Sequence, residues 1–241
     1  MIYSKSASVV LLVTALLFGN SDCLEAVSRK PKIKVVEPVQ PKSESYYDNI
    51  WRKWQVGSKK DQAEVLKDLR ATVKKNNDEF MAHYYLGIML TEEGNLIQAT
   101  NHLENSLAGF PKSADIYARI AENYEKRNKP AIAITNYEKA LELDSNNATA
   151  LSKLGLNALS NGESALAEAY LSKAKTIEPE KVETIVGLAA AFNENSKPSE
   201  AVPLLDQALL FDGTNAEAYW QLAKAYEKLA QADKAAANYT K

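Results

Sequence analysis

The stretch "YEKALELDSNNATALSKLG", Tyr137 to Gly155, shows how this chain is organised. It contains no set of metal ligands, no phosphate-binding loop and no recognisable nucleophile, yet its small residues recur at fixed places. In rows of 34 residues that start at Phe80, the twentieth position is alanine in every row: Ala99, Ala133, Ala167, Ala201 and Ala235. This regularity indicates that the small residues serve the packing of repeated segments.

Other row positions repeat in the same register. The seventh position holds Leu86, Ile120, Leu154, Leu188 and Leu222, and the eighth holds Gly87, Ala121, Gly155, Ala189 and Ala223. Two helices approach closely only where a side chain is small, and large apolar side chains fill the space that is left. Pro130 and Pro198 stand where a second helix would begin, the one helical place that tolerates proline well. The rows therefore predict pairs of antiparallel helices.

This pattern closely resembles the tetratricopeptide repeat, a helix–turn–helix unit of 34 residues. The resemblance implies an all-α fold, a right-handed superhelical solenoid of stacked hairpins. Residues 46–241 then form about six repeats, of which the first lacks the small residues and carries Trp51 and Trp54 instead. The predicted repeats are 46–79 (degenerate), 80–113, 114–147, 148–181, 182–215 and 216–241 (incomplete).

Two segments precede the repeats. Residues 1–23 are predicted to be a signal peptide or signal-anchor, because Lys5 is followed by the apolar core Ala7–Phe18. That core is too short to span a bilayer unless its flanks take part. Residues 24–45 contain three prolines and alternating charges, which predicts an extended linker.

Cys23 offers more than one reading of the N-terminus. Cleavage is expected after Cys23, with cleavage after Ser21 or Ala26 as alternatives. Cys23 is also where a bacterial lipoprotein would be lipidated, although Asn20 and Asp22 replace the leucine and the small residue that this signal prefers. All readings predict an exported protein, periplasmic or envelope-associated if bacterial and secreted if not, with membrane contact only through the N-terminal segment.

Composition excludes several functions. The 29 basic and 31 acidic residues leave a net charge of −2, which gives no general attraction to nucleic acid and argues against helical repeats that read RNA bases. A single cysteine excludes an intramolecular disulfide. Two histidines, His83 and His102, are too few for a zinc site without many carboxylates, and both are predicted to pack at helix interfaces. We expect no catalytic site, no metal and no cofactor, and therefore no enzyme.

The resemblance implies a concave groove, lined by the first helix of each repeat, that binds a protein segment. The residues at matching positions are Met81, Tyr84, Tyr85, Ile88, Arg119, Lys153, Leu156, Leu159, Val186 and Trp220. Most are apolar or aromatic, which favours a partner-binding surface. The alternative is that several only pack against neighbouring first helices. Arg119 and Lys153 are all that remains of the clamp with which chaperone-tail binders of this family hold a terminal carboxylate, so that function is not expected.

The sequence therefore predicts a non-catalytic interaction scaffold or adaptor of the secretory pathway or cell envelope. Signal, linker and repeats together resemble small bacterial envelope proteins of this family, which include the pilotins that help type IV pilus secretins assemble, so an assembly factor of this kind is an alternative. The sixth repeat reaches Lys241 inside its second helix, and self-association through that repeat is a further expectation. The identity of the partner cannot be read from the residues.

Overall fold

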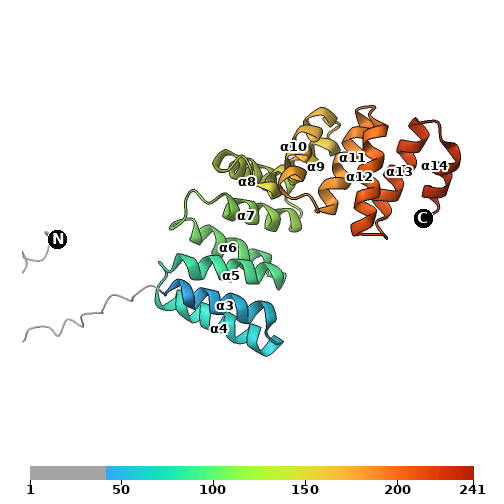
Figure 1. Ribbon diagram of the computed structural model, residues 1–241. Coiled ribbons are helices and arrows are strands. Elements are labelled where there is room, and N and C mark those ends of the chain that lie inside the picture. Colours follow the sequence, from blue (N-terminus) through green and yellow to red (C-terminus); the bar gives the residue numbers. More distant parts are fainter. Residues whose placement is uncertain (1–41) are drawn as a thin grey trace, which may run out of the picture. The chain divides into compact units, whose positions relative to one another are not determined.

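The computed structural model describes residues 42–241, so the predicted signal segment, Cys23 and nearly all of the linker lie outside the described residues. Within residues 42–241 the structure is all helical, and successive hairpins lie side by side as a repeat solenoid (Figure 1). The helices are α3 (Glu44–Val56), α4 (Lys59–Lys75), α5 (Phe80–Glu92), α6 (Leu96–Ser106), α7 (Ala114–Lys126), α8 (Pro130–Leu143), α9 (Ala148–Ser160), α10 (Ser164–Ile177), α11 (Val182–Glu194), α12 (Pro198–Phe211), α13 (Ala216–Lys228) and α14 (Ala232–Tyr239). We call the odd-numbered helices first helices and the even-numbered ones second helices.

Helix starts follow the 34-residue rows. The first helices α5, α7, α9, α11 and α13 each begin at a row start and are each 13 residues long. Ser113, Asn147 and Asn215 cap three of them, each accepting a hydrogen bond from a backbone N–H in the first turn. Pro130 and Pro198 begin α8 and α12, as the sequence predicts.

The turn inside each hairpin also repeats. The residue at the fifteenth row position always has a positive φ, between 56° and 80°. The backbone N–H of the sixteenth residue donates to the carbonyl of the eleventh residue of the same row, at 2.8–2.9 Å. This is the Schellman ending of a helix, in which one residue adopts the left-handed conformation. The residues in that conformation are Gly94, Asn128, Gly162, Ser196 and Ala230. Glycine therefore serves this turn in only two of the five hairpins.

Small residues sit where paired helices meet. All five alanines at the twentieth position are buried, with 0–3% of their surface exposed. At Gly155, a Cβ atom would stand 2.6 Å from Cγ of Leu171 on the second helix of the same hairpin. Because normal contacts between carbon atoms are near 3.5–4.0 Å, the backbones come closer here than any other residue type would allow.

The first hairpin uses aromatic residues in place of small ones. α3 begins at Glu44, two residues before the predicted first repeat, because Ser43 caps it. Tyr47 and Trp54 are buried against α5. The Tyr47 hydroxyl donates to Glu79, the residue before α5, at 2.8 Å, and Trp54 Nε1 donates to Glu92 in α5 at 2.5 Å. α3 and α4 therefore pack on the next hairpin through bulky side chains.

No helix within residues 42–241 combines the length and the apolar character needed to cross a bilayer.

Candidate partner-binding groove

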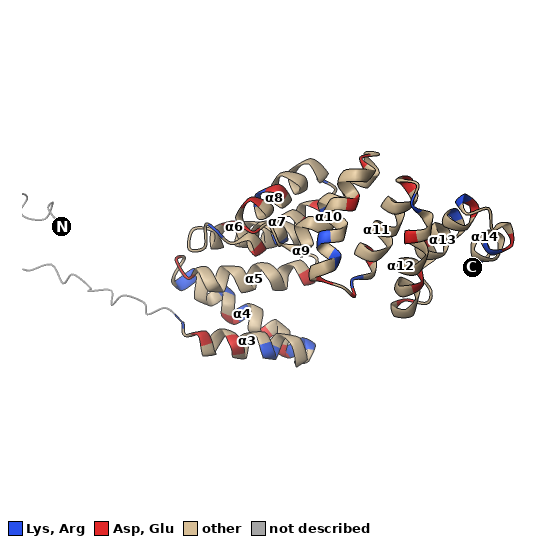
Figure 2. Ribbon diagram, turned by 45° about the horizontal axis from the view of Figure 1, so that its top comes forward, with Lys and Arg blue, Asp and Glu red and all other residues tan. Residues whose placement is uncertain are grey.

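The ten predicted groove residues all lie on first helices, and the structure divides them among different surroundings. α5 carries Met81, Tyr84, Tyr85 and Ile88, α7 carries Arg119, α9 carries Lys153, Leu156 and Leu159, α11 carries Val186, and α13 carries Trp220. In Figure 2, α5, α9 and α11 show few coloured segments, because these helices contain few charged residues.

Three of these residues line one pocket of about 490 Å³ across α9, α11 and α13, which we call the α9–α13 pocket. Leu156, Leu159 and Val186 contribute apolar surface to it. The full lining is Leu156, Leu159, Val182, Glu183, Val186, Gly187, Ala190, Asp212, Asn215, Glu217 and Gln221. A volume of this size, with a mostly apolar floor and a few polar groups, is typical of ligand pockets.

The polar groups of the α9–α13 pocket are held in place by hydrogen bonds. Gln221, 5% exposed, donates from Nε2 to Glu217 at 2.9 Å, and its Oε1 accepts from Asn193 Nδ2 at 3.1 Å. Asp212 accepts bonds from Thr214 and Asn215, and these bonds lower the pKa of its carboxyl group. Hydrogen bonds therefore hold the polar groups at the rim of the pocket in place.

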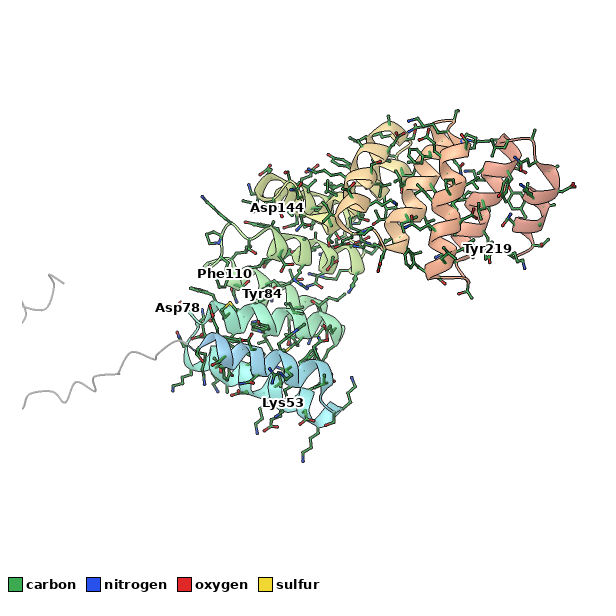
Figure 3. The ribbon with its side chains drawn as sticks, viewed as in Figure 1. Lys53, Asp78, Tyr84, Phe110, Asp144 and Tyr219 are labelled. Atoms are coloured by element: carbon green, nitrogen blue, oxygen red, sulfur yellow. The ribbon has the colours of Figure 1, made fainter. Side chains whose placement is uncertain are left out.

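The aromatic residues of α5 are engaged in packing. Tyr85 stacks on Tyr47 of α3, with ring centroids 5.3 Å apart, and lies 6.0 Å from the ring of Trp51. Tyr84, labelled in Figure 3, donates from its hydroxyl to Asp115 of α7 at 2.7 Å. Burial, helped by the bond to Asp115, raises the pKa of Tyr84 to about 12. This part of the predicted groove follows the alternative reading, in which first helices pack on one another.

Ile88 and Met81 also belong to the interior of the stack. Ile88 is only 6% exposed, and Met81 is partly buried against the core formed by α3, α4 and α5. Neither side chain offers much surface to a partner.

Both cationic groove residues already have anionic partners. Arg119 Nε lies 2.8 Å from Asp115, and Lys153 Nζ lies 2.9 Å from Glu183 and 3.6 Å from Glu125. Burial alone would lower the pKa of Lys153, but the bond to Glu183 and the neighbouring carboxylates outweigh it and raise that pKa. A peptide carboxylate at either residue would have to compete with these acidic side chains.

Trp220 lies apart from the α9–α13 pocket. It is 46% exposed and lines a separate pocket of about 480 Å³ between α13 and α14, near Tyr219 in Figure 3. The equivalent fifth-position residues Ala118, Ser152 and Val186 are buried, and Ser152 is hydrogen bonded to the following first helix through Thr184. The fifth row position is therefore buried in these earlier repeats, where Val186 lies in the α9–α13 pocket, whereas Trp220 is exposed beside α14.

Comparison with known proteins agrees with the repeat architecture. Residues 126–162 match the family model described as "TPR repeat", and residues 216–241 match the one described as "Tetratricopeptide repeat". The chain contains tetratricopeptide repeats. Both matching models describe repeats and neither describes an enzyme family.

Among similar proteins is the type IV pilus assembly protein PilF of Pseudomonas aeruginosa, 30% identical over 138 residues. That match covers 56% of this chain and 55% of PilF, so the chain spans about half the length of this relative. A solved structure of P. aeruginosa PilF superposes with a TM-score of 0.55 at 26% identity, over 67% of this chain and 73% of that one.

Two further solved structures share the fold at lower identity. YrrB, titled a TPR protein with an unusual peptide-binding site, has a TM-score of 0.60 at 18% identity and covers 70% of this chain and 88% of its own. MamA has a TM-score of 0.56 at 18% identity and covers 67% of this chain and 88% of its own. At these identities the likeness establishes the fold alone.

Sequence reasoning missed two features of the tetratricopeptide stack. Asp212 and Asn215 reach the pocket from the α12–α13 loop, whereas the family positions point only to first helices.

His83 and His102 form a pair, with Nδ1 atoms 2.9 Å apart, and Nε2 of His83 is buried without a hydrogen-bond partner among the described residues. Burial lowers the pKa of His83, while burial and the His83 charge lower that of His102 to about 4. Both rings therefore stay neutral near pH 7.

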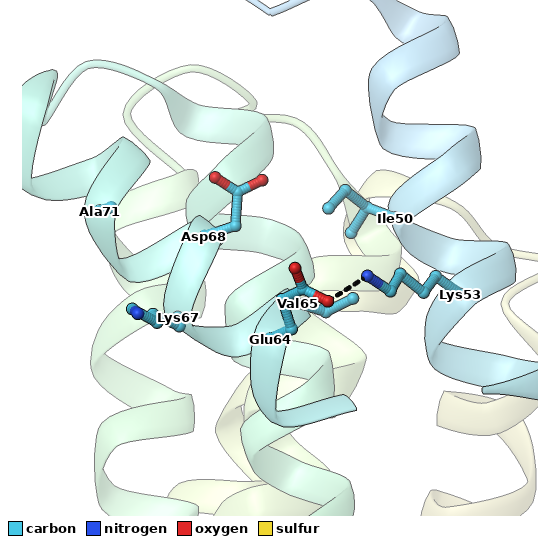
Figure 4. Close-up of a pocket in the computed structure, with 7 residues that line it drawn as sticks. All are labelled: Ile50, Lys53, Glu64, Val65, Lys67, Asp68 and Ala71. Carbon is cyan, nitrogen blue, oxygen red and sulfur yellow. Dashed lines mark hydrogen bonds and ion pairs between the residues drawn. The ribbon is translucent and has the colours of Figure 1, made fainter. Parts of the chain in front are cut away.

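A different pocket, of about 470 Å³, lies between α3 and α4 (Figure 4). Charged side chains make up most of its lining, and Lys53 Nζ lies 2.6 Å from Glu64 there. It has less apolar floor than the α9–α13 pocket and is the weaker candidate for a partner site.

Over residues 42–241, no cluster of three or more histidine, cysteine or acidic side chains could hold a metal ion.

Proposed function

We propose that this chain is a non-catalytic scaffold that binds a segment of a partner protein in the α9–α13 pocket. The observation that carries the proposal is one open and largely apolar pocket, in which the half-buried Leu156 and Leu159 of α9 lie beside the buried Val186 of α11. Apolar surface that is open to water in a pocket favours a bound partner, because removing apolar surface from water lowers the free energy.

The cell envelope or secretory pathway is the proposed location. Two observations support it: the apolar stretch Ala7–Phe18 has the pattern of an export signal, and PilF, similar over about half its length, is named for pilus assembly. A role in assembling a pilus or secretion complex is therefore the second candidate function. Mass analysis of the native protein tests the N-terminus, since cleavage after Cys23, lipidation of Cys23 and retention of Met1 give different masses.

Photo-crosslinking tests the binding proposal directly. A photoreactive amino acid at Leu159, which is half-buried in the pocket, should capture a partner in the native envelope. The same amino acid at Leu166, exposed on α10 outside the pocket lining, is the matched control. Once a partner is captured, Leu159→Glu should weaken its binding by about 30-fold or more, the effect of losing a hot-spot contact at the centre of an interface, and Leu166→Glu should not.

Circular dichroism must show that both variants remain helical. A folded Leu159→Glu protein that binds the partner as tightly as the parent would exclude the pocket as the site.

Self-association through the last repeat is a separate proposal. The exposed rings of Trp220 and Tyr239 on the α13–α14 surface support it. Light scattering over a range of protein concentrations tests it, and a mass that stays monomeric up to high concentration would contradict it.

A further inference from the structure

The floor and the rim of the α9–α13 pocket differ in chemistry. The floor is formed by apolar residues of α9 and α11, while the rim carries Glu183, Asp212 and Glu217. These carboxylates come from α11, the α12–α13 loop and α13, so they surround the opening from three elements. None of the described residues that line the pocket is a lysine or an arginine.

Only one of the three carboxylates has a cationic partner nearby. Glu183 is paired with Lys153, which it shares with Glu125. Among residues 42–241, Glu217 and Asp212 have no lysine or arginine nitrogen within 4.0 Å, and their bonds are to neutral donors. The rim therefore keeps unneutralised negative charge beside apolar surface.

This arrangement selects among partner segments. A partner that covers the floor also excludes water from the rim, which strengthens the electrostatic interactions there. An anionic side chain or a terminal carboxylate would meet repulsion, whereas a cationic side chain would pair with the carboxylates at the rim. Lysine and arginine also have apolar stems that can extend along the floor.

We propose that the segment bound in the α9–α13 pocket carries a lysine or arginine directly beside its apolar anchor residues. This inference rests on the proposed function, because it describes the partner of the same pocket. It predicts the opposite preference to that of repeats that clamp a terminal carboxylate.

Selection from a displayed library of random 12-residue peptides tests the inference on the full chain. Peptides that bind the parent protein are screened against Leu159→Asn, which removes apolar floor without adding charge. We expect peptides that depend on Leu159 to be enriched in lysine or arginine next to leucine-like or aromatic residues. Their affinities are then measured by fluorescence polarisation.

Charge variants complete the test. Glu217→Gln keeps the oxygen that accepts from Gln221 but loses the charge, and it should weaken the selected peptides by roughly two- to fivefold at low salt and less at high salt. Glu138→Gln, at an exposed position of α8 outside the pocket lining, should leave affinity unchanged.

The outcomes separate the two proposals. Peptides that need Leu159 but show no cationic enrichment, or that bind Glu217→Gln as well as the parent, would overturn this inference and leave the pocket as a binding site. A library that yields no peptide dependent on Leu159 would overturn the binding proposal as well.

Discussion

Gly155→Ala should destabilise the protein, whereas the same change at Gly187 should stabilise it. Both glycines lie within first helices, and at both a new Cβ atom would stand 2.6 Å from a leucine carbon. At Gly155 that carbon is Cγ of Leu171, which is fully buried and cannot move without displacing its neighbours. At Gly187 it is the terminal Cδ2 of Leu156, a half-buried side chain that can rotate into the α9–α13 pocket.

Two opposing free-energy terms give the magnitudes. Alanine is favoured over glycine inside a helix by about 1 kcal/mol, and this gain applies at both sites. Overpacking a filled core costs about 1–3 kcal/mol, which applies in full only at Gly155. We therefore expect a net loss of about 1 kcal/mol for Gly155→Ala and a gain of up to about 1 kcal/mol for Gly187→Ala.

Urea unfolding monitored by circular dichroism measures the free energy of unfolding of both variants. In a thermal melt, each kilocalorie per mole should move the melting temperature by about 2–4 °C. Hydrogen exchange of α9 and α10 serves as a second measurement, because stacked repeats can unfold in parts. The reasoning fails if Gly155→Ala is as stable as the parent, or if the two variants change stability in the same direction.

Three further predictions concern packing, turn geometry and pH. Ala167→Leu should cost about 1–3 kcal/mol by overpacking a fully buried position, whereas Ala165→Leu, exposed on the same helix, should not, as thermal melts will show. Ala230→Gly should add about 1 kcal/mol of stability, because the φ of 58° suits glycine better than alanine; an unchanged urea midpoint would contradict this. The folded-state pKa values of His83 and His102 lie below the unfolded value near 6.5. The unfolded state therefore binds more protons, and the melting temperature should fall as the pH drops from about 6.5 toward 4. His102→Gln should flatten that dependence, and an equally steep profile in the variant would assign it to other groups.

Much of the fold follows from the sequence because each repeat meets the same local requirements. The helix starts at Ala114, Ala148 and Ala216 coincide with row starts because a capping serine or asparagine precedes each of them. The left-handed residue of each turn is harder to find, since glycine and, less often, asparagine are the residues expected there, yet Ser196 and Ala230 also adopt this conformation.

The candidate site is less predictable, because its chemistry depends on contacts between repeats. Tyr85 fits the family's ligand positions, yet it stacks on Tyr47 of a first repeat whose sequence is atypical. Trp220 occupies a position that a following repeat covers elsewhere in the stack. Asp212 and Asn215 enter the pocket from a loop, where no periodicity identifies them.

The polar contacts between neighbouring first helices differ among three of the interfaces. Thr91 donates to Asn123 between α5 and α7, the Ser152 and Thr184 hydroxyls pair between α9 and α11, and Asn193 donates to Gln221 between α11 and α13. Each of these repeats therefore makes polar contacts that only its own neighbour satisfies.

A deletion of residues 148–181 illustrates the consequence. It would keep the 34-residue spacing and all the remaining small residues in register, yet it would place Thr184 against the methyl group of Ala118 instead of the Ser152 hydroxyl. A buried hydroxyl that loses its partner costs about 1–3 kcal/mol. Deleting or exchanging a whole repeat therefore destabilises the protein, even though the repeats have the same length and the same small residues. The contacts between repeats thus constrain both the number of repeats and their order.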